Sequence, residues 1–158
     1  MEFQRPNRDE PERVFVVVKN SYETASLAAN QWVAWDHLTD QDGIAVTKPG
    51  GELLTSGAGV VIETIDHEQF GLVQVWGYRK GARCSGGSGL VTSKISAGTV
   101  LVLKTSGFAA AAMHALDSSA GTQPYHLFPV GVGIVPTNTA AQATSATTWV
   151  GNVFVRCL

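Results

Sequence analysis

Short runs of β-branched and apolar residues, separated by small and polar residues, recur along most of the chain. The run "RVFVVVK" at 13–19 predicts a strand that is buried on both faces. After the turn "TDQDG" the runs are short and regularly spaced, which is typical of a β-sandwich or a β-barrel. We expect strands at 44–47, 59–65, 71–79, 89–93, 99–105, 108–114, 129–136 and 149–158.

One segment has a different pattern. In "NSYETASLAANQWVAWDHL", at 20–38, Thr24 can cap a helix, and Leu27, Gln31 and Trp35 fall near one face of it. We therefore expect one short helix in a mainly β chain.

Charge is concentrated at the start of the chain. Seven of the first thirteen residues are charged, and Pro6 and Pro11 break any helix there. We expect residues 1–12 to form an extended N-terminal arm and residues 13–158 to form a single β-rich domain. The arm is either a flexible terminus or a segment that orders on a neighbouring subunit.

The composition supports one domain with few charges. A chain of 158 residues can bury a self-sufficient core, and 15% of its residues are charged against roughly 25% in an ordinary soluble domain. Small residues replace the charges, as is common where neighbouring subunits cover a surface, although a compact monomer is equally compatible. The net charge of −2 argues against a basic face that would bind nucleic acid directly.

Neither a targeting segment nor a disulfide scaffold is expected. The sequence contains no apolar core of a signal peptide and no run near the roughly 20 apolar residues of a membrane span, so we expect synthesis in the cytoplasm and no membrane partner. Cys84 and Cys157 stand outside any C-x-x-C motif and are too few for a zinc site. They are interpreted as reduced thiols, and a single bridge between them remains open.

Candidate catalytic groups are sparse. The motif "GGSGL" at 86–90 lacks the strand-to-helix turn of a nucleophile elbow. Between Phe70 and Leu158 the sequence has one acidic residue, Asp117, so a carboxylate pair for glycoside hydrolysis is not available there. Each of the four histidines stands in a different segment: His37, His67, His114 and His126.

The Asp–His neighbours "WDH" at 35–37 and "IDHE" at 65–68 look like turns at the ends of elements and are interpreted as solvated turn residues. On a strand, adjacent side chains would point to opposite faces, which argues against a shared metal. We expect no metal, no cofactor and no enzymatic activity.

The run "FPVGVGIV" at 128–135 could begin a phosphate-binding loop, because Gly131 and Gly133 have G-x-G spacing. No helix pattern follows, however, and Pro136 ends the run. As a strand it would have one face without side chains, which we expect to lie against an aromatic side chain or another backbone. Trp76, Tyr78 and Trp149 are the candidates for that aromatic side chain.

The tryptophans allow a second interpretation. An exposed set could bind carbohydrate, whereas the alternative is that all four pack in the core, two on the expected helix and two on strands. The four are Trp32, Trp35, Trp76 and Trp149.

Three segments of the C-terminal part resemble the small head-decoration or capsid-stabilising proteins of tailed bacteriophages. They are "SAGTVLVLKTSGFAAAA" at 96–112, "FPVGVGIVPT" at 128–137 and the valine-rich "WVGNVFVRCL" at 149–158. The strand "FGLVQVWGY" at 70–78 is similar to strands of phage virion proteins, so that the resemblance covers roughly residues 58–158.

The resemblance implies a structural protein without catalysis that decorates or stabilises an assembled shell on the capsid surface of a virion. Its partners would be the major capsid protein and sister subunits in a homo-oligomer, often a trimer. We expect contacts to the capsid or to sister subunits from Phe3, Arg5, Arg8, Glu10 and Arg13.

The segment 24–38 and the loop "TNTAAQATSATT" at 137–148 are not part of the pattern of that family. A tail-associated location therefore stays open, as does a carbohydrate-binding or host-receptor-binding β-domain.

Overall fold

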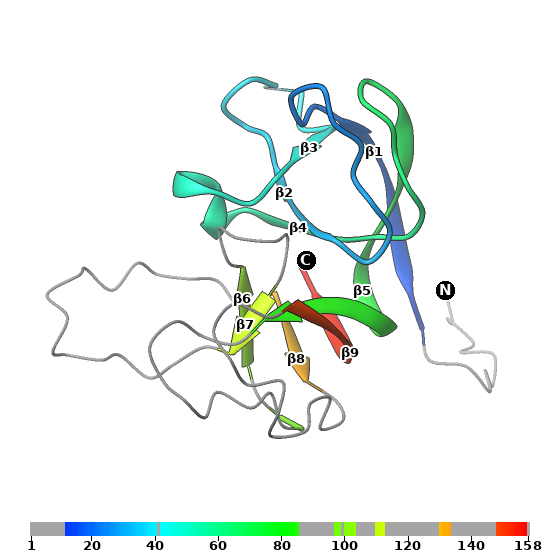
Figure 1. Ribbon diagram of the computed structural model, residues 1–158, viewed down its shortest axis with the longest axis vertical. Coiled ribbons are helices and arrows are strands. Elements are labelled where there is room, and N and C mark those ends of the chain that lie inside the picture. The colour runs from blue at the N-terminus through cyan, green and yellow to red at the C-terminus, as the bar shows by residue number, and fades with distance from the viewer. Residues whose placement is uncertain are drawn as a thin grey trace, which may run out of the picture.

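Strands make up most of the chain that the computed structural model describes, which is residues 12–40, 42–85, 97–98, 100–103, 110–112, 130–133 and 148–157. The mainly β class predicted from the sequence is confirmed (Figure 1). The elements are β1 (Val14–Asn20), β2 (Trp32–Trp35), β3 (Ala45–Thr47), the 3₁₀ helix η1 (Gly51–Thr55), β4 (Gly57–Val61), β5 (Phe70–Ser85), β6 (Val100–Leu103), β7 (Ala110–Ala112), β8 (Gly131–Gly133) and β9 (Thr148–Arg156).

The described strands form two closed sets of pairings. The order β1-β3-β2-β4-β5 is closed by pairing of β1 with β5, which forms a five-stranded barrel. The order β5-β7-β6-β8-β9 is closed by pairing of β5 with β9. Figure 1 shows the barrel strands in the upper part and β6 to β9 below them, with β5 passing between the two groups.

The 16 residues of β5 therefore serve both groups. Its first half pairs with β1 and β4, and its second half pairs with β9. Trp76 stands at the change, because it is opposite Val14 of β1 and Arg156 of β9. The next residue, Gly77, has a φ of +98°, and a Cβ there would overlap the carbonyl oxygen of Glu12, so only glycine lets the chain before β1 approach so closely.

Two clusters of buried side chains fill the described structure. The barrel core consists of Val18, Leu27, Val33, Val46, Ala58, Val61, Ile65, Val73 and Val75. The second core consists of Trp32, Ala34, Leu53, Val60, Ala82, Cys84, Leu101, Leu103, Val130, Val153 and Val155. Neighbouring residues of β2 and of β4 belong to different cores, so these two strands are buried on both faces.

The predicted helix over 20–38 is wrong. Its last part is β2, which pairs with β3 and β4, and the helical element within the described residues is η1. The reason is burial on two sides: Val33 enters the barrel core, while Trp32 and Ala34 enter the second core. A helix of this length would bury one face only.

Most predicted strands are confirmed with shifted ends. Strands expected at 44–47, 59–65, 71–79, 99–105, 108–114, 129–136 and 149–158 are found as β3 to β9, and the strand expected at 89–93 lies outside the described residues. The strand at 13–19 is found as β1, but its predicted burial on both faces is wrong because Phe15 and Val17 are exposed. Residues 1–11 of the expected arm lie outside the described residues. The division of the chain into an arm and a domain therefore stays a prediction.

Candidate contact surface

The outer face of the β1–β5 pair carries apolar side chains that face solvent. Val17 lies directly opposite Leu72, and Lys19 lies opposite Phe70. Phe15 is 43% exposed, Val17 64%, Phe70 62% and Leu72 39%. These four residues are called the apolar strip below.

The alternation along β1 explains why the strip faces outward. Val18 and Asn20 are buried and Val14 and Val16 are half-buried, so the residues between them point away from the barrel core. On β2 and β4 the outward-facing residues are instead covered by the second core. Scattered apolar residues on a surface are ordinary, but contiguous ones on one sheet face mark a site of protein contact.

Arg13 is the one predicted contact residue that the structure describes. It is exposed and comes directly before β1, close to Gly77. Phe3, Arg5, Arg8 and Glu10 lie outside the described residues.

Beside Arg13, the Arg79 side chain is half-buried and held by the turn before β2 and the end of β4. Its Nη2 donates to Oδ1 of Asn30 at 2.7 Å and to the carbonyl oxygens of Val61 and Ile62, each at 3.4 Å. Burial, and then the positive charge of Arg13, lower the pKa of Arg79. Arg13 thus places positive charge two residues before Phe15, at one end of the strip.

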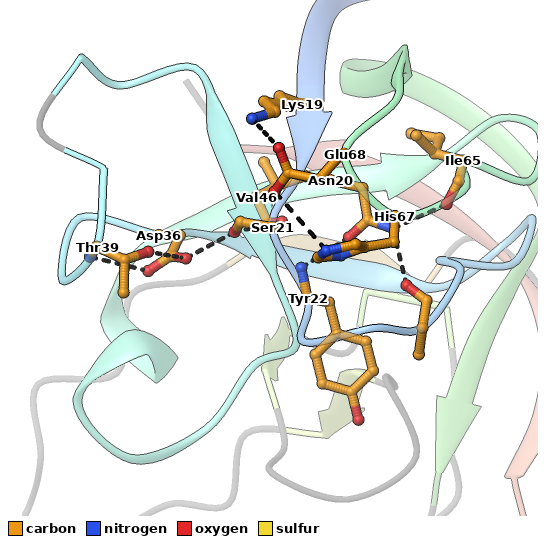
Figure 2. A network of polar contacts seen from close by, with 11 residues as sticks. Lys19, Asn20, Ser21, Tyr22, Asp36, Thr39, Val46, Ile65, His67 and Glu68 are labelled. Atoms are coloured by element: carbon orange, nitrogen blue, oxygen red, sulfur yellow. Dashed lines mark hydrogen bonds and ion pairs between the residues drawn. The ribbon is translucent and has the colours of Figure 1, made fainter.

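A buried polar network joins the ends of β1 and β2 (Figure 2). Asp36 is 6% exposed, and its Oδ2 accepts hydrogen bonds from Ser21 Oγ at 2.6 Å and from Thr39 Oγ1 at 2.5 Å. Burial raises the pKa of Asp36, whereas the hydrogen bonds from Ser21, Thr39 and the Leu38 backbone lower it. The hydrogen bonds together have the larger effect, so the pKa lies below its ordinary value of 3.8. The interpretation of Asp36 as a solvated turn residue is therefore wrong, whereas His37 beside it is exposed.

Asn20 is the second fixed point of this network. Its Nδ2 donates to the carbonyl oxygens of Ala25 and Ile65, each at 2.9 Å, and its Oδ1 accepts from the backbone N–H of Tyr22 at 2.8 Å. Every polar atom of this fully buried amide side chain has a partner. The bonds tie loops together and leave no reactive group, so the network is structural.

The histidines do not form a metal site within the described residues. His67 lies on the turn before β5, where its Nε2 is 3.8 Å from Oε1 of Glu68, which itself pairs with Lys19 (Figure 2). In the part of the chain that the structure describes, no group of three or more histidine, cysteine, aspartate or glutamate side chains could hold a metal ion. His114 and His126 lie outside it.

Both cysteines are free, as predicted, and neither is a nucleophile at neutral pH. Burial raises the pKa of Cys84 to about 12 and that of Cys157 to about 12. Because the thiolate is the reactive form, these thiols are unreactive in the folded chain.

Gly131 of β8 confirms the expectation drawn from "FPVGVGIV". A Cβ at this position would lie 2.7 Å from the carbonyl oxygen of Phe154 and 3.2 Å from Cη2 of Trp32. At Gly131, the bare face of the strand therefore lies against another backbone and an aromatic ring. The ring belongs to Trp32, which was not among the expected candidates.

The tryptophans with described side chains do not form an exposed platform. Trp32 is fully buried, and Trp35 and Trp76 are half-buried. The ring of Trp76 makes an edge-to-face contact with Phe154, with the ring centroids 5.1 Å apart. The side chain of Trp149 lies outside the described residues.

Comparisons with known proteins give one structural neighbour. No protein-family model matches the chain, and no curated protein matches it. The chain is similar to the N base of the head fiber gp8.5 of bacteriophage phi29, with 12% sequence identity and a TM-score of 0.48 over 92% of this chain and 96% of that one. A similarity of this degree carries no argument about function. Within the described residues, no helix is long and apolar enough to cross a membrane.

Proposed function

We propose that this chain is a structural protein of a tailed-bacteriophage virion, which binds the assembled capsid shell and decorates or stabilises it. The observation that carries the proposal is the apolar strip, because exposed apolar side chains on one sheet face are suited to contact with other subunits of an assembly. The sequence motifs that resemble phage head-decoration proteins specify the setting, a virion surface.

The strand pairing favours contact through faces and segments over contact through sheet edges. Each described strand is paired with a neighbour on both sides, over two or more residues. An incoming strand would therefore find free backbone chiefly along residues 14–18 of β1, which among the described residues pair with β5 alone. Partners would instead meet the strip or the N-terminal arm.

The arm is the proposed anchor on the shell. Glu12 lies against Gly77 at the point where β5 passes from one group of strands to the other, so the arm leaves the domain beside β1. The proposed contacts to the major capsid protein or to sister subunits are Phe3, Arg5, Arg8, Glu10 and Arg13. Many weak contacts of this kind, repeated over a lattice, give a strong overall attachment.

The test removes the arm while keeping the domain. Deleting residues 1–11, with Glu12 retained because its carbonyl packs on Gly77, should leave a folded domain that no longer co-sediments with shells made from the major capsid protein of the same phage. A chain with residues 1–11 replaced by a Gly/Ser segment of equal length is the control for mere length. If the deletion leaves shell occupancy unchanged, the arm is not the anchor; if the intact chain binds no shell, the virion role is wrong.

A further inference from the structure

We propose that the apolar strip binds a second copy of this chain across a two-fold axis that runs across the strands. This deepens the proposed function by assigning one partner, the sister subunit, to a particular surface.

The strip can face a copy of itself. Val17 and Leu72 form its centre, Phe15 lies towards one end on β1 and Phe70 lies at the other end on β5. The local two-fold symmetry of an antiparallel pair relates Phe15 to Phe70 and Val17 to Leu72. The strip therefore presents the same kinds of side chain when it is read from either end. In a two-fold interface one patch contacts its own copy, and such a strip can do so.

The two ends of the strip carry opposite charge. At the Phe15 end, the exposed Arg13 stands two residues before Phe15, so alternation along the chain puts both side chains on the same side of β1. The opposite end is acidic. The segment between β4 and β5, which leads into Phe70, carries exposed Glu63, Asp66 and Glu68, of which Lys19 neutralises Glu68.

The charges select one of two possible axes. An axis parallel to the strands would bring Arg13 of one copy near Arg13 of the other, and like charges repel. An axis across the strands places the basic end of each copy on the acidic end of its partner. The apolar centre is then covered and ion pairs form at its two ends, in keeping with the apolar core and polar rim of a protein interface.

The same charges favour a copy of the chain over an unrelated partner. An unrelated protein would have to supply an apolar row with an acidic group at one end and a basic group at the other. This chain already presents that complement, in the required order, on the strip itself.

The first experiment measures self-association of the purified full chain without shells, by sedimentation velocity over a wide concentration range. We expect a monomer–dimer equilibrium, and Val17→Asp should raise the dimer Kd at least tenfold. The matched control is Leu38→Asp, because Leu38 is 61% exposed, close to the 64% of Val17, and lies outside the strip. A wild-type chain that stays monomeric at the highest concentration, or equal weakening by Leu38→Asp, would overturn the proposal.

The second experiment exchanges the charges. The basic-end variant is Arg13→Glu, and the acidic-end variant is Glu63→Lys. Each variant alone should dimerise at least tenfold more weakly than the wild type, because acid then meets acid or base meets base. Mixed one to one, the two variants should form heterodimers of near wild-type affinity, because both sets of ion pairs are restored.

Each other result of the mixing experiment counts against the proposal. If the mixture is as weak as its components, the ends do not meet. If the wild type forms trimers, the axis is not two-fold, and a mixture of two variants cannot then close a ring of three with all pairs restored.

Failure of this inference and failure of the proposed function are separable. Self-association is measured without shells, and the chain that lacks residues 1–11 should retain it while losing shell binding. Loss of the dimer on removing the arm would show that the arm, and not the strip, joins the copies.

Discussion

At the scale of single residues, Gly131 marks a place where two segments leave no room for a side chain. Gly131→Ala should destabilise the fold by about 1–3 kcal/mol, because the added Cβ would meet the carbonyl oxygen of Phe154 at 2.7 Å, and backbone there cannot yield. Gly50→Ala is the control, since nothing lies within 4 Å of a Cβ at Gly50. Urea unfolding measures both, and equal losses in the two variants would contradict the close packing of β8.

Asp36 makes stability depend on pH on the acid side. Its pKa in the folded chain lies below its ordinary value of 3.8, so the fold favours the ionised form. The resulting stability is present above about pH 4 and is lost as the pH falls through the lowered pKa. Asp36→Asn should reduce stability at pH 7 by about 1–3 kcal/mol and flatten the acid branch of the curve.

The measurement for Asp36 is the free energy of unfolding from pH 2.5 to pH 7 in the wild type and the variant. Glu68→Gln is the comparison, because the pKa of Glu68 is also lowered, chiefly by its hydrogen bond with Lys19, but its side chain is exposed. The difference from wild type should depend on pH much less for Glu68→Gln than for Asp36→Asn. Parallel curves for wild type and Asp36→Asn would contradict the network.

Single residues also show how much of the structure can be predicted from the sequence. The bare face at Gly131 could be predicted because alternation along a strand is local. Its aromatic neighbour could not, because Trp32 comes from a strand about a hundred residues earlier in the chain. The burial of Asp36 was missed for a similar reason: Thr39 is near in sequence, but Ser21 and the cover over the carboxylate are not.

At the scale of elements, the sequence predicts where most strands lie but not which of their faces are buried. The run at 13–19 predicted a strand buried on both faces, and the structure gives a strand with one exposed face. The two-sided strands are β2 and β4, and β2 was mistaken for a helix because consecutive apolar residues fit either pattern. The candidate contact surface follows from this difference, since the sequence shows that β1 is apolar but not what covers it.

At the scale of the molecule, the fold is determined by the two pairings that close the strand orders, β1 with β5 and β5 with β9. Local patterns left a sandwich and a barrel open, because the choice depends on whether β1 pairs with β5. That pairing joins Val14 to Trp76 and Lys19 to Phe70 across more than fifty residues of chain. No local period in the sequence records such a register.

The shared elements predict that the two cores unfold together. β5 belongs to both groups of strands, and adjacent residues of β2 enter different cores. Ile65→Ala in the barrel core and Leu101→Ala in the second core should each cost about 2–5 kcal/mol and lower the Tm of one common transition. Far-UV circular dichroism and tryptophan fluorescence should give coincident curves in the wild type and in both variants. Exposed Leu38→Ala should leave the Tm unchanged. Two transitions, each moved by one core variant alone, would mean that β5 joins two groups of strands that unfold independently.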